Sequence, residues 1–242
     1  MKEILTIAES TWKGILKMKV VYFLVICVWI LIGSMYRYNE ISLDRHRELM
    51  LDMSMFLNQL AGILTVLSLT FDIPRELREG IAATFLTKSL GRTKYLLGKT
   101  LGVYVVALVV NLLIAAGSYF IYQYCFDQAI LQNFIKIELL IMMGVIPMAA
   151  VCVFCAIALP EMAAPIIALL AIWFATLTRH ISLPVLSGGV LPDLELFNLK
   201  EHIIYPVEIP WSYLFGALIW GVAYAVFLLM LSGIIFRFKD IK

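Results

Sequence analysis

Long apolar stretches with almost no charged residues recur along this chain, and they restrict the folds open to it. A helix needs about 20 apolar residues to cross the roughly 30 Å hydrocarbon core of a bilayer. Six stretches approach or exceed that length, at residues 20–36, 53–71, 96–122, 137–159, 162–178 and 211–236. Each is continuously apolar, whereas the strands of a membrane barrel alternate apolar and polar residues. The sequence therefore predicts an all-α fold, a polytopic membrane protein with six transmembrane helices.

The composition points the same way. Of the 242 residues, 62% are hydrophobic and 15% are charged, against about 45–50% and about 25% in soluble domains. We therefore expect one transmembrane domain, residues 1–242, embedded in the lipid bilayer. Its expected parts are an N-terminal interfacial helix (1–19), helices one and two (20–71), a cytoplasmic segment (72–95), helices three to five (96–178), an outer loop (179–210), helix six (211–236) and a cytoplasmic tail (237–242).

The distribution of lysine and arginine predicts the orientation. Short cytoplasmic loops accumulate these residues. The N-terminal segment, the loop between the second and third spans and the C-terminal tail together carry 13 of them, and the opposite side carries 6. The sequence therefore predicts a multi-pass membrane protein with both termini in the cytoplasm. The basic residues are explained by topology, so no nucleic-acid partner is expected.

The N-terminal segment shows a helical pattern of its own. Ile4, Ala8, Trp12 and Ile15 recur at helical spacing, with lysines between them. This pattern predicts an amphipathic helix whose apolar face lies in the headgroup region of the membrane. A flexible tail is the alternative.

The segment between the second and third spans is the longest and most highly charged cytoplasmic connection. Pro74 suits the first turn of a helix and Gly91 suits its end, while Leu77, Ile81 and Phe85 form one apolar stripe. A helix of this kind can rest one side on the bundle and present the other to a cytoplasmic partner. A solvated connector helix with nothing docked is the alternative.

The outer loop at residues 179–210 contains several prolines and glycines but also many apolar residues. It is too interrupted for a span and too apolar for a free linker. We expect short interfacial helices that pack over the outer mouth of the bundle, either as a gate or as simple packing.

The sequence contains no motif for catalysis, metal binding or cofactor binding. The three histidines fall in outer loops and no nucleophile is paired with a base, so no catalytic residue is predicted. Gly98-Lys99-Thr100 resembles the end of a phosphate-binding loop, but Thr93 stands where that motif needs glycine. Gly98 and Gly102 instead form a G-x-x-x-G step, which permits close approach of a second helix.

Polar residues within the spans are few. Lys136 and Glu138 are expected at an outer end and Glu161 in a short inner turn, which disfavours a self-sufficient ion-coupled pump. The deeper polar side chains, which are candidates for lining a path or for helix packing, are Asn58, Gln59, Asn111 and Ser118.

Two stretches carry a resemblance to a known family. The first comprises Arg75-Glu76-Leu77-Arg78-Glu79-Gly80, Phe85-Leu86, Gly91-Arg92-Thr93-Lys94-Tyr95-Leu96-Leu97-Gly98-Lys99 and Leu101-Gly102. It resembles the cytoplasmic segment of type 2 ATP-binding-cassette (ABC) exporter permeases, which have six helices and a separate ATPase. The second comprises Leu191-Pro192-Asp193-Leu194 with Phe197-Asn198-Leu199 and the terminal Phe236-Arg237-Phe238-Lys239-Asp240, which resemble the outer loop and tail of that family.

The resemblance implies a permease subunit of an ATP-driven ABC transporter. ATP and Mg²⁺ would bind a separate ABC ATPase, and this chain would hold no cofactor and act as no enzyme. A second permease copy or a homologous permease would complete the path. The helix from Pro74 to about Leu90 would be the coupling helix, and the residues expected to contact the ATPase are Glu76, Glu79, Gly80, Phe85 and Leu86. The resemblance also implies that the protein lies in the cell (cytoplasmic) membrane.

Two other classes stay open from the sequence. One is a non-transporting membrane anchor or assembly subunit for a cytoplasmic partner, which would keep the same basic loop. The other is a membrane enzyme, which would need an added cofactor because nucleophile and metal sites are lacking.

Overall fold

The computed structural model describes residues 2–17, 19–35, 46–80, 91–125, 131–176, 192–199 and 208–238, and in those residues the fold is helical with no strand. The predicted all-α fold is confirmed. The helices, in chain order, are α1 (Lys2–Leu16), α2 (Lys19–Met35), α3 (His46–Leu67), α4 (Leu69–Arg78), α6 (Arg92–Cys125), α7 (Leu131–Ala158), α8 (Ala163–Thr176), the 3-10 helix η2 (Leu194–Phe197) and α9 (Trp211–Phe238).

Several helices are long and apolar enough to cross a membrane. Within the described residues these are Met50–Arg78, Arg92–Tyr124, Asn133–Ala158 and Trp211–Phe238, and α1 and α2, which meet at 57°, count as a fifth if they are taken as one span. Helix α8 has 14 residues, a length of about 21 Å at 1.5 Å per residue. It is shorter than the 162–178 span predicted from the sequence, whose last two residues lie outside the described part. Four or five spans are thus supported, and six stays a prediction.

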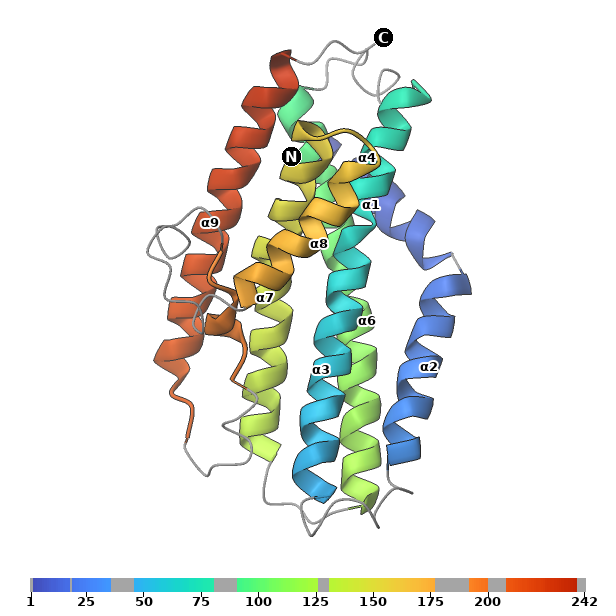
Figure 1. Cartoon of the computed structure of the whole chain (residues 1–242), viewed down its shortest axis with the longest axis vertical. Coiled ribbons are helices and arrows are strands. Elements are labelled where there is room, and N and C mark those ends of the chain that lie inside the picture. The colour runs from blue at the N-terminus through green and yellow to red at the C-terminus, as the bar shows by residue number, and fades with distance from the viewer. Residues whose placement is uncertain are drawn as a thin grey trace.

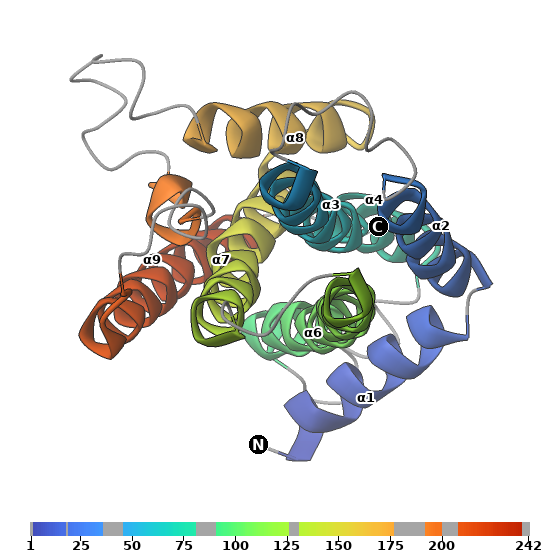
Figure 2. The ribbon, with the colours of Figure 1, turned by 90° about the horizontal axis from the view of Figure 1, so that it is seen from below.

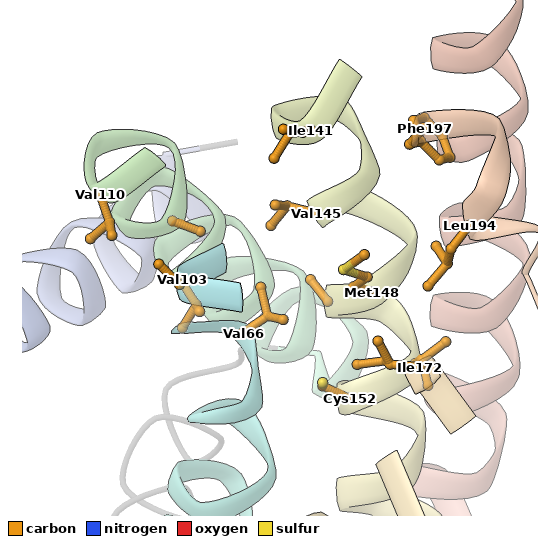
Figure 3. Packing of buried hydrophobic residues seen from close by; sticks show 14 of the residues in the cluster. Val66, Val103, Val110, Ile141, Val145, Met148, Cys152, Ile172, Leu194 and Phe197 are labelled. Carbon is orange, nitrogen blue, oxygen red and sulfur yellow. The ribbon is translucent and has the colours of Figure 1, made fainter. Parts of the chain in front are cut away.

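Helix α7 forms the centre of the bundle (Figures 1 and 2). It contacts α3, α4, α6, α8, α9 and η2, which explains why it is the most buried of the candidate spans. In Figure 3, Val66 and Val103 lie on one side of α7, and Leu194 and Phe197 of η2 lie on the other. We call the end where α4, α7 and α9 finish and α6 begins the α4 end of the bundle.

Helix α1 packs across the first half of α6. Its residues Ile7, Ala8, Thr11 and Ile15 are buried. The glycines of the G-x-x-x-G step permit this, because a Cβ atom at Gly98 would lie 2.8 Å from the Cβ atom of Ile7. The prediction of an N-terminal helix is confirmed, but the face expected among lipid headgroups packs against α6.

The connection from α3 to α4 differs from the prediction. Helix α4 begins at Leu69, and Ser68 alone separates it from α3, so Pro74 lies inside α4 instead of in a first turn. Proline crowds the carbonyl four residues before it and removes one helix hydrogen bond. The break at Ser68 lies two residues before that carbonyl, which belongs to Thr70. The second span therefore continues as α4 up to Arg78, seven residues beyond its predicted end at Phe71.

The predicted helix from Pro74 to about Leu90 is not continuous, and its predicted stop at Gly91 depends on residues 81–90, which lie outside the described residues. Helix α4 ends at Arg78, and Gly80 follows with a φ angle of +72°, the left-handed conformation that glycine adopts at the ends of helices. Gly91 comes directly before α6, where its carbonyl accepts from the amide of Lys94. Of the predicted apolar stripe, Leu77 lies in the last turn of α4, and Ile81 and Phe85 lie outside the described residues.

The described part of the outer loop packs deeper than predicted. Phe197 of η2 fits between α7 and α9, where a Cβ atom at Gly144 or at Gly221 would lie 3.0 Å from its side chain. Both glycines fall near the middle of their helices, so η2 lies beside the bundle instead of over its mouth (Figure 1). The space left by two glycines explains how an aromatic ring enters there.

Candidate functional site

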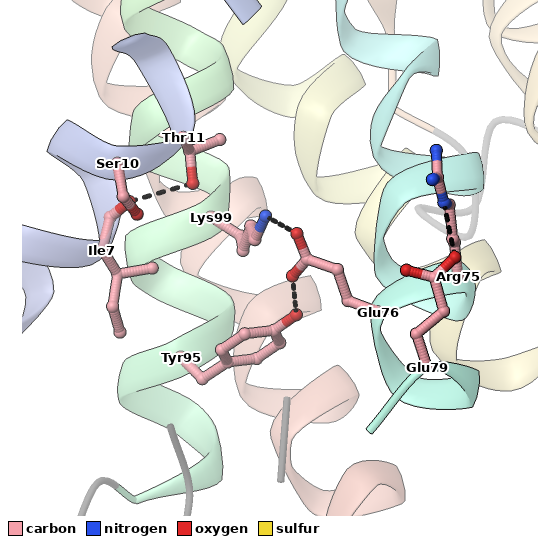
Figure 4. Close-up of polar contacts among 8 residues, drawn as sticks. All are labelled: Ile7, Ser10, Thr11, Arg75, Glu76, Glu79, Tyr95 and Lys99. Atoms are coloured by element: carbon pink, nitrogen blue, oxygen red, sulfur yellow. Dashed lines mark hydrogen bonds and ion pairs between the residues drawn. The ribbon is translucent and has the colours of Figure 1, made fainter. Parts of the chain in front are cut away.

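A buried polar cluster joins α4 to α6 at the α4 end of the bundle. One carboxylate oxygen of Glu76 accepts a hydrogen bond from the Tyr95 hydroxyl at 2.6 Å. The other forms an ion pair with the Lys99 ammonium (Figure 4). Tyr95 is fully buried and Lys99 is 7% exposed. We call these three residues the Glu76 cluster.

The sequence places these groups together through helical spacing. Tyr95 and Lys99 stand four residues apart on α6, so they share one face of that helix. Glu76 stands in the last half of α4, and Asp72 lies one turn before it and interacts electrostatically with Lys99. Two carboxylates of α4 therefore surround one ammonium of α6. Separating α4 from α6 would leave a largely buried charge without its partner, which is strongly destabilising. The Glu76 cluster therefore holds α4 against α6.

Further polar contacts radiate from the same end of the bundle. They link α4 to the turn before α8, α6 to α1, and α6 to the last turn of α9. The contacts are Arg78 with Glu161 at 2.8 Å, Lys94 with Glu3 at 3.0 Å, and the Arg92 guanidinium donating to the carbonyl oxygens of Phe236 at 2.6 Å and Arg237 at 2.9 Å. The two ion pairs are exposed and each stabilises by about 0–1 kcal/mol. These exposed pairs orient the helix ends. The more buried Glu76 cluster is expected to contribute more to holding α4 on α6.

The residues predicted to contact a partner fall into three groups. Glu76 is engaged by Tyr95 and Lys99 of the same chain, and its side chain is 20% exposed. Glu79 is exposed at the end of α4 and accepts from the Arg75 guanidinium at 2.9 Å. Gly80 forms the turn at which the chain leaves α4. Phe85 and Leu86 lie outside the described residues.

The candidate path-lining residues are separated by the structure. Asn58 donates a hydrogen bond to Glu138 across the α3–α7 contact. Asn111 packs where α3, α6 and α7 meet, because a Cβ atom at Gly62 would lie 3.1 Å from the Asn111 amide. Ser118 donates to the carbonyl of its own helix at 2.9 Å, which is a packing role. Gln59 is half-buried on α3, one residue from Asn58.

Lys136 and Glu138 were expected at an outer end of their span, and they lie in the first third of α7. They are nevertheless buried, at 8% and 4% exposed. Helix α7 begins at Leu131, before the predicted start at residue 137, so both residues lie inside a continuous helix. The Lys136 ammonium donates to the Ile209 carbonyl at 2.8 Å and lies 5.5 Å from the ring centre of Trp211. The spans are thus less free of charge than the sequence indicated.

Sequence reasoning missed three residues of these polar contacts: Tyr95, Lys99 and Glu138. Lys99 was counted as a marker of orientation, although it stands within an apolar stretch where a lysine needs a partner. Its spacing of four from Tyr95 is a usable signal, but the identity of Glu76 as their partner depends on how α4 packs.

No family model matches the sequence, and no curated protein matches it. In the described part of the chain, no three His, Cys, Asp or Glu side chains gather as metal ligands would. What the site does is therefore argued from its own contacts.

Proposed function

We propose that this chain is the transmembrane permease subunit of an ATP-driven ABC exporter of the second type. It would span the cell membrane six times with both termini in the cytoplasm, and the α4 end of the bundle would face the cytoplasm. A separate ABC ATPase would bind ATP and Mg²⁺, and a second permease copy or a homologue would complete the path. The resemblance of residues 75–102 to the family's cytoplasmic segment is the starting point.

The main support for the proposal is that the charged segment after Gly80 is joined directly to α4, which is held on α6 by the Glu76–Lys99 ion pair. The segment that would dock on the ATPase leaves α4 at Gly80. One turn before this exit, Glu76 is tied to Lys99 of α6. A displacement applied after Gly80 is therefore passed through α4 to α6, and through Arg78 and Glu161 to the turn before α8.

The mechanism needs such a rigid connection. Moving a two-state equilibrium from 1:99 to 99:1 takes about 5.5 kcal/mol of differential binding. If α4 slid freely on α6, closure of the ATPase pair would move the segment and leave the bundle behind. Glu79, exposed and paired with Arg75 on the same helix, would offer its carboxylate to a basic group of the ATPase. Phe85 and Leu86 would seat the segment in a groove of the ATPase.

Affinity purification tests this proposal. The tagged chain is purified from its native membrane in mild detergent, and ATPase activity is assayed in the eluate. We expect an ATPase to co-purify with the unmodified chain and to be lost from the double variant Glu79→Arg, Phe85→Asp. Reversing the charge at Glu79 also sets two basic groups against each other on α4, which releases the side chain from Arg75 and repels a basic partner.

Glu9→Arg supplies the matched control. Glu9 is likewise exposed and likewise paired with a basic residue of its own helix four positions away, Lys13, but it lies in α1. This variant should retain the ATPase. If no ATPase co-purifies at any detergent strength, the permease function is wrong, and the non-transporting anchor becomes the better description.

A further inference from the structure

A single carboxyl group is buried between helices in the half of the bundle opposite the α4 end. Glu138 of α7 is 4% exposed and is the one glutamate or aspartate that is buried among the described residues. It stands within the candidate span Asn133–Ala158, facing α3. Acidic groups inside membrane spans are costly and mark functional positions.

The hydrogen bonding around this carboxyl is incomplete in a specific way. The Asn58 amide nitrogen donates to Glu138 Oε2. Glu138 Oε1 and Asn58 Oδ1 are both buried and both lack a hydrogen-bond partner among the described residues. A buried polar atom without a hydrogen-bond partner is costly, so the ionised acid and the amide together leave two such atoms.

A proton on Glu138 would give both oxygens a hydrogen bond. A neutral carboxyl group has one O–H donor, and an acid and an amide can pair through two hydrogen bonds, one in each direction. The existing bond runs from the Asn58 nitrogen to Glu138 Oε2. An O–H on Oε1 donating to Asn58 Oδ1 would close the ring and satisfy the two orphan oxygens together. No side chain of the described residues offers a donor to Oε1 in its place.

The charged and titratable groups around α7 do not neutralise this carboxyl. Lys136 is committed to the Ile209 carbonyl. Among the described side chains, the others in this half of the bundle on elements that pack on α7 include Asp52 of α3, Tyr119, Tyr122 and Tyr124 of α6, Glu195 of η2 and Tyr213 of α9; none of them is hydrogen-bonded to Glu138 Oε1. α4 and α8 pack on the other half of α7. An ionised Glu138 would therefore be a buried charge without an ion-pair partner among the described side chains, a state that proteins avoid by binding a proton.

We propose that Glu138 is an intramembrane proton-binding site, and that its proton closes a two-bond pair with Asn58 that holds α3 against α7. Loss of the proton leaves both of these buried oxygens without a hydrogen bond and loosens that contact. Protonation of Glu138 thus sets the packing of α3 on α7. The inference rests on this contact alone and does not depend on an ATPase partner.

Infrared spectroscopy of the purified full-length chain in lipid vesicles tests the proposal. We expect the carbonyl stretch of a protonated carboxyl at neutral pH, its loss in Glu138→Gln, and its gradual disappearance as the pH is raised. Glu161→Gln, which removes an exposed carboxylate paired with Arg78, is the control and should leave the band unchanged. Labelling glutamate with ¹³C in the unmodified protein should shift the band, which keeps the test valid if Glu138→Gln fails to fold.

Three outcomes are distinguished. A band with these properties supports the proton site. Absence of a protonated-carboxyl band at neutral pH means that Glu138 is ionised and overturns it. Loss of the band when NaCl replaces choline chloride at constant ionic strength means that sodium bridges the two oxygens in place of a proton, and this also overturns the proposal.

Discussion

Lys99→Met is expected to lower the free energy of unfolding by about 3 kcal/mol, the cost of leaving one charge of a buried pair uncompensated. Methionine preserves the length and apolar stem of the side chain, so the change isolates the ammonium. Glu76 would then keep only the Tyr95 hydroxyl and would lie beside Asp72, a like charge that also faces Lys99. The measurement is denaturant unfolding in detergent micelles, followed by tryptophan fluorescence.

A double-mutant cycle separates the ion pair from general packing. Glu76→Gln combined with Lys99→Met removes both charges, and we expect it to be more stable than Lys99→Met alone, because no uncompensated Glu76 carboxylate remains. Lys13→Met is the matched control, since Lys13 pairs with Glu9 on the surface of α1, where such a pair is worth about 0.3–0.5 kcal/mol. If Lys99→Met costs no more than Lys13→Met, the Glu76 cluster does not fix α4 to α6, and the proposed route of force through α4 loses its support.

The helical fold follows from the sequence because its signal is local. Continuous apolar stretches predict helices wherever they occur, and the stretches behind α2, α6, α7 and α9 all form them. The boundaries were less accurate where two local rules compete. Pro74 was expected to start a helix, but an apolar and helix-compatible stretch already extended α3 through Ser68 into α4, and the buried Leu69 and Ile73 stabilise that extension. Packing of the earlier residues outweighed the preference of proline for a first turn.

The polar contacts were harder to predict because their partners lie far apart in the sequence. Glu76 was singled out as a contact for a partner protein, and nothing in the order of residues indicated that α4 would place it against Tyr95 and Lys99. The position of Glu138 was missed for a related reason. It stands near the start of an apolar stretch, which suggests exposure at a helix end, whereas α7 begins earlier and Asn58 of α3 covers the carboxyl. Pairings of this kind are set by which helices meet.

The contact at the G-x-x-x-G step could be predicted from the sequence only in part. Its spacing predicted a close helix contact at Gly98 and Gly102, and the contact is present, but the partner is α1. The sequence of α1 gave its apolar side and did not identify what that side would cover, since lipid and a glycine-lined helix are both suitable surfaces.

Gly102→Ala is expected to separate α1 from α6. The added Cβ atom would lie 2.7 Å from the Cβ atom of Thr11 and 2.8 Å from the backbone oxygen of Ala8, and a backbone oxygen cannot rotate away as a side chain can. Relief therefore requires the two helices to move apart. We expect a loss of about 1–3 kcal/mol in the free energy of unfolding and faster amide hydrogen exchange throughout α1.

The sign of the effect makes this prediction decisive. In a helix interior, alanine is ordinarily more stable than glycine by about 0.5–1 kcal/mol, and Gly33→Ala in α2 should show that gain because nothing lies within 4 Å of a Cβ atom there. Opposite signs at Gly33 and Gly102 would mean that α1 is held directly on α6. If Gly102→Ala is as stable as Gly33→Ala and exchange in α1 is unchanged, α1 does not rest on these glycines, and its apolar face is covered by lipid.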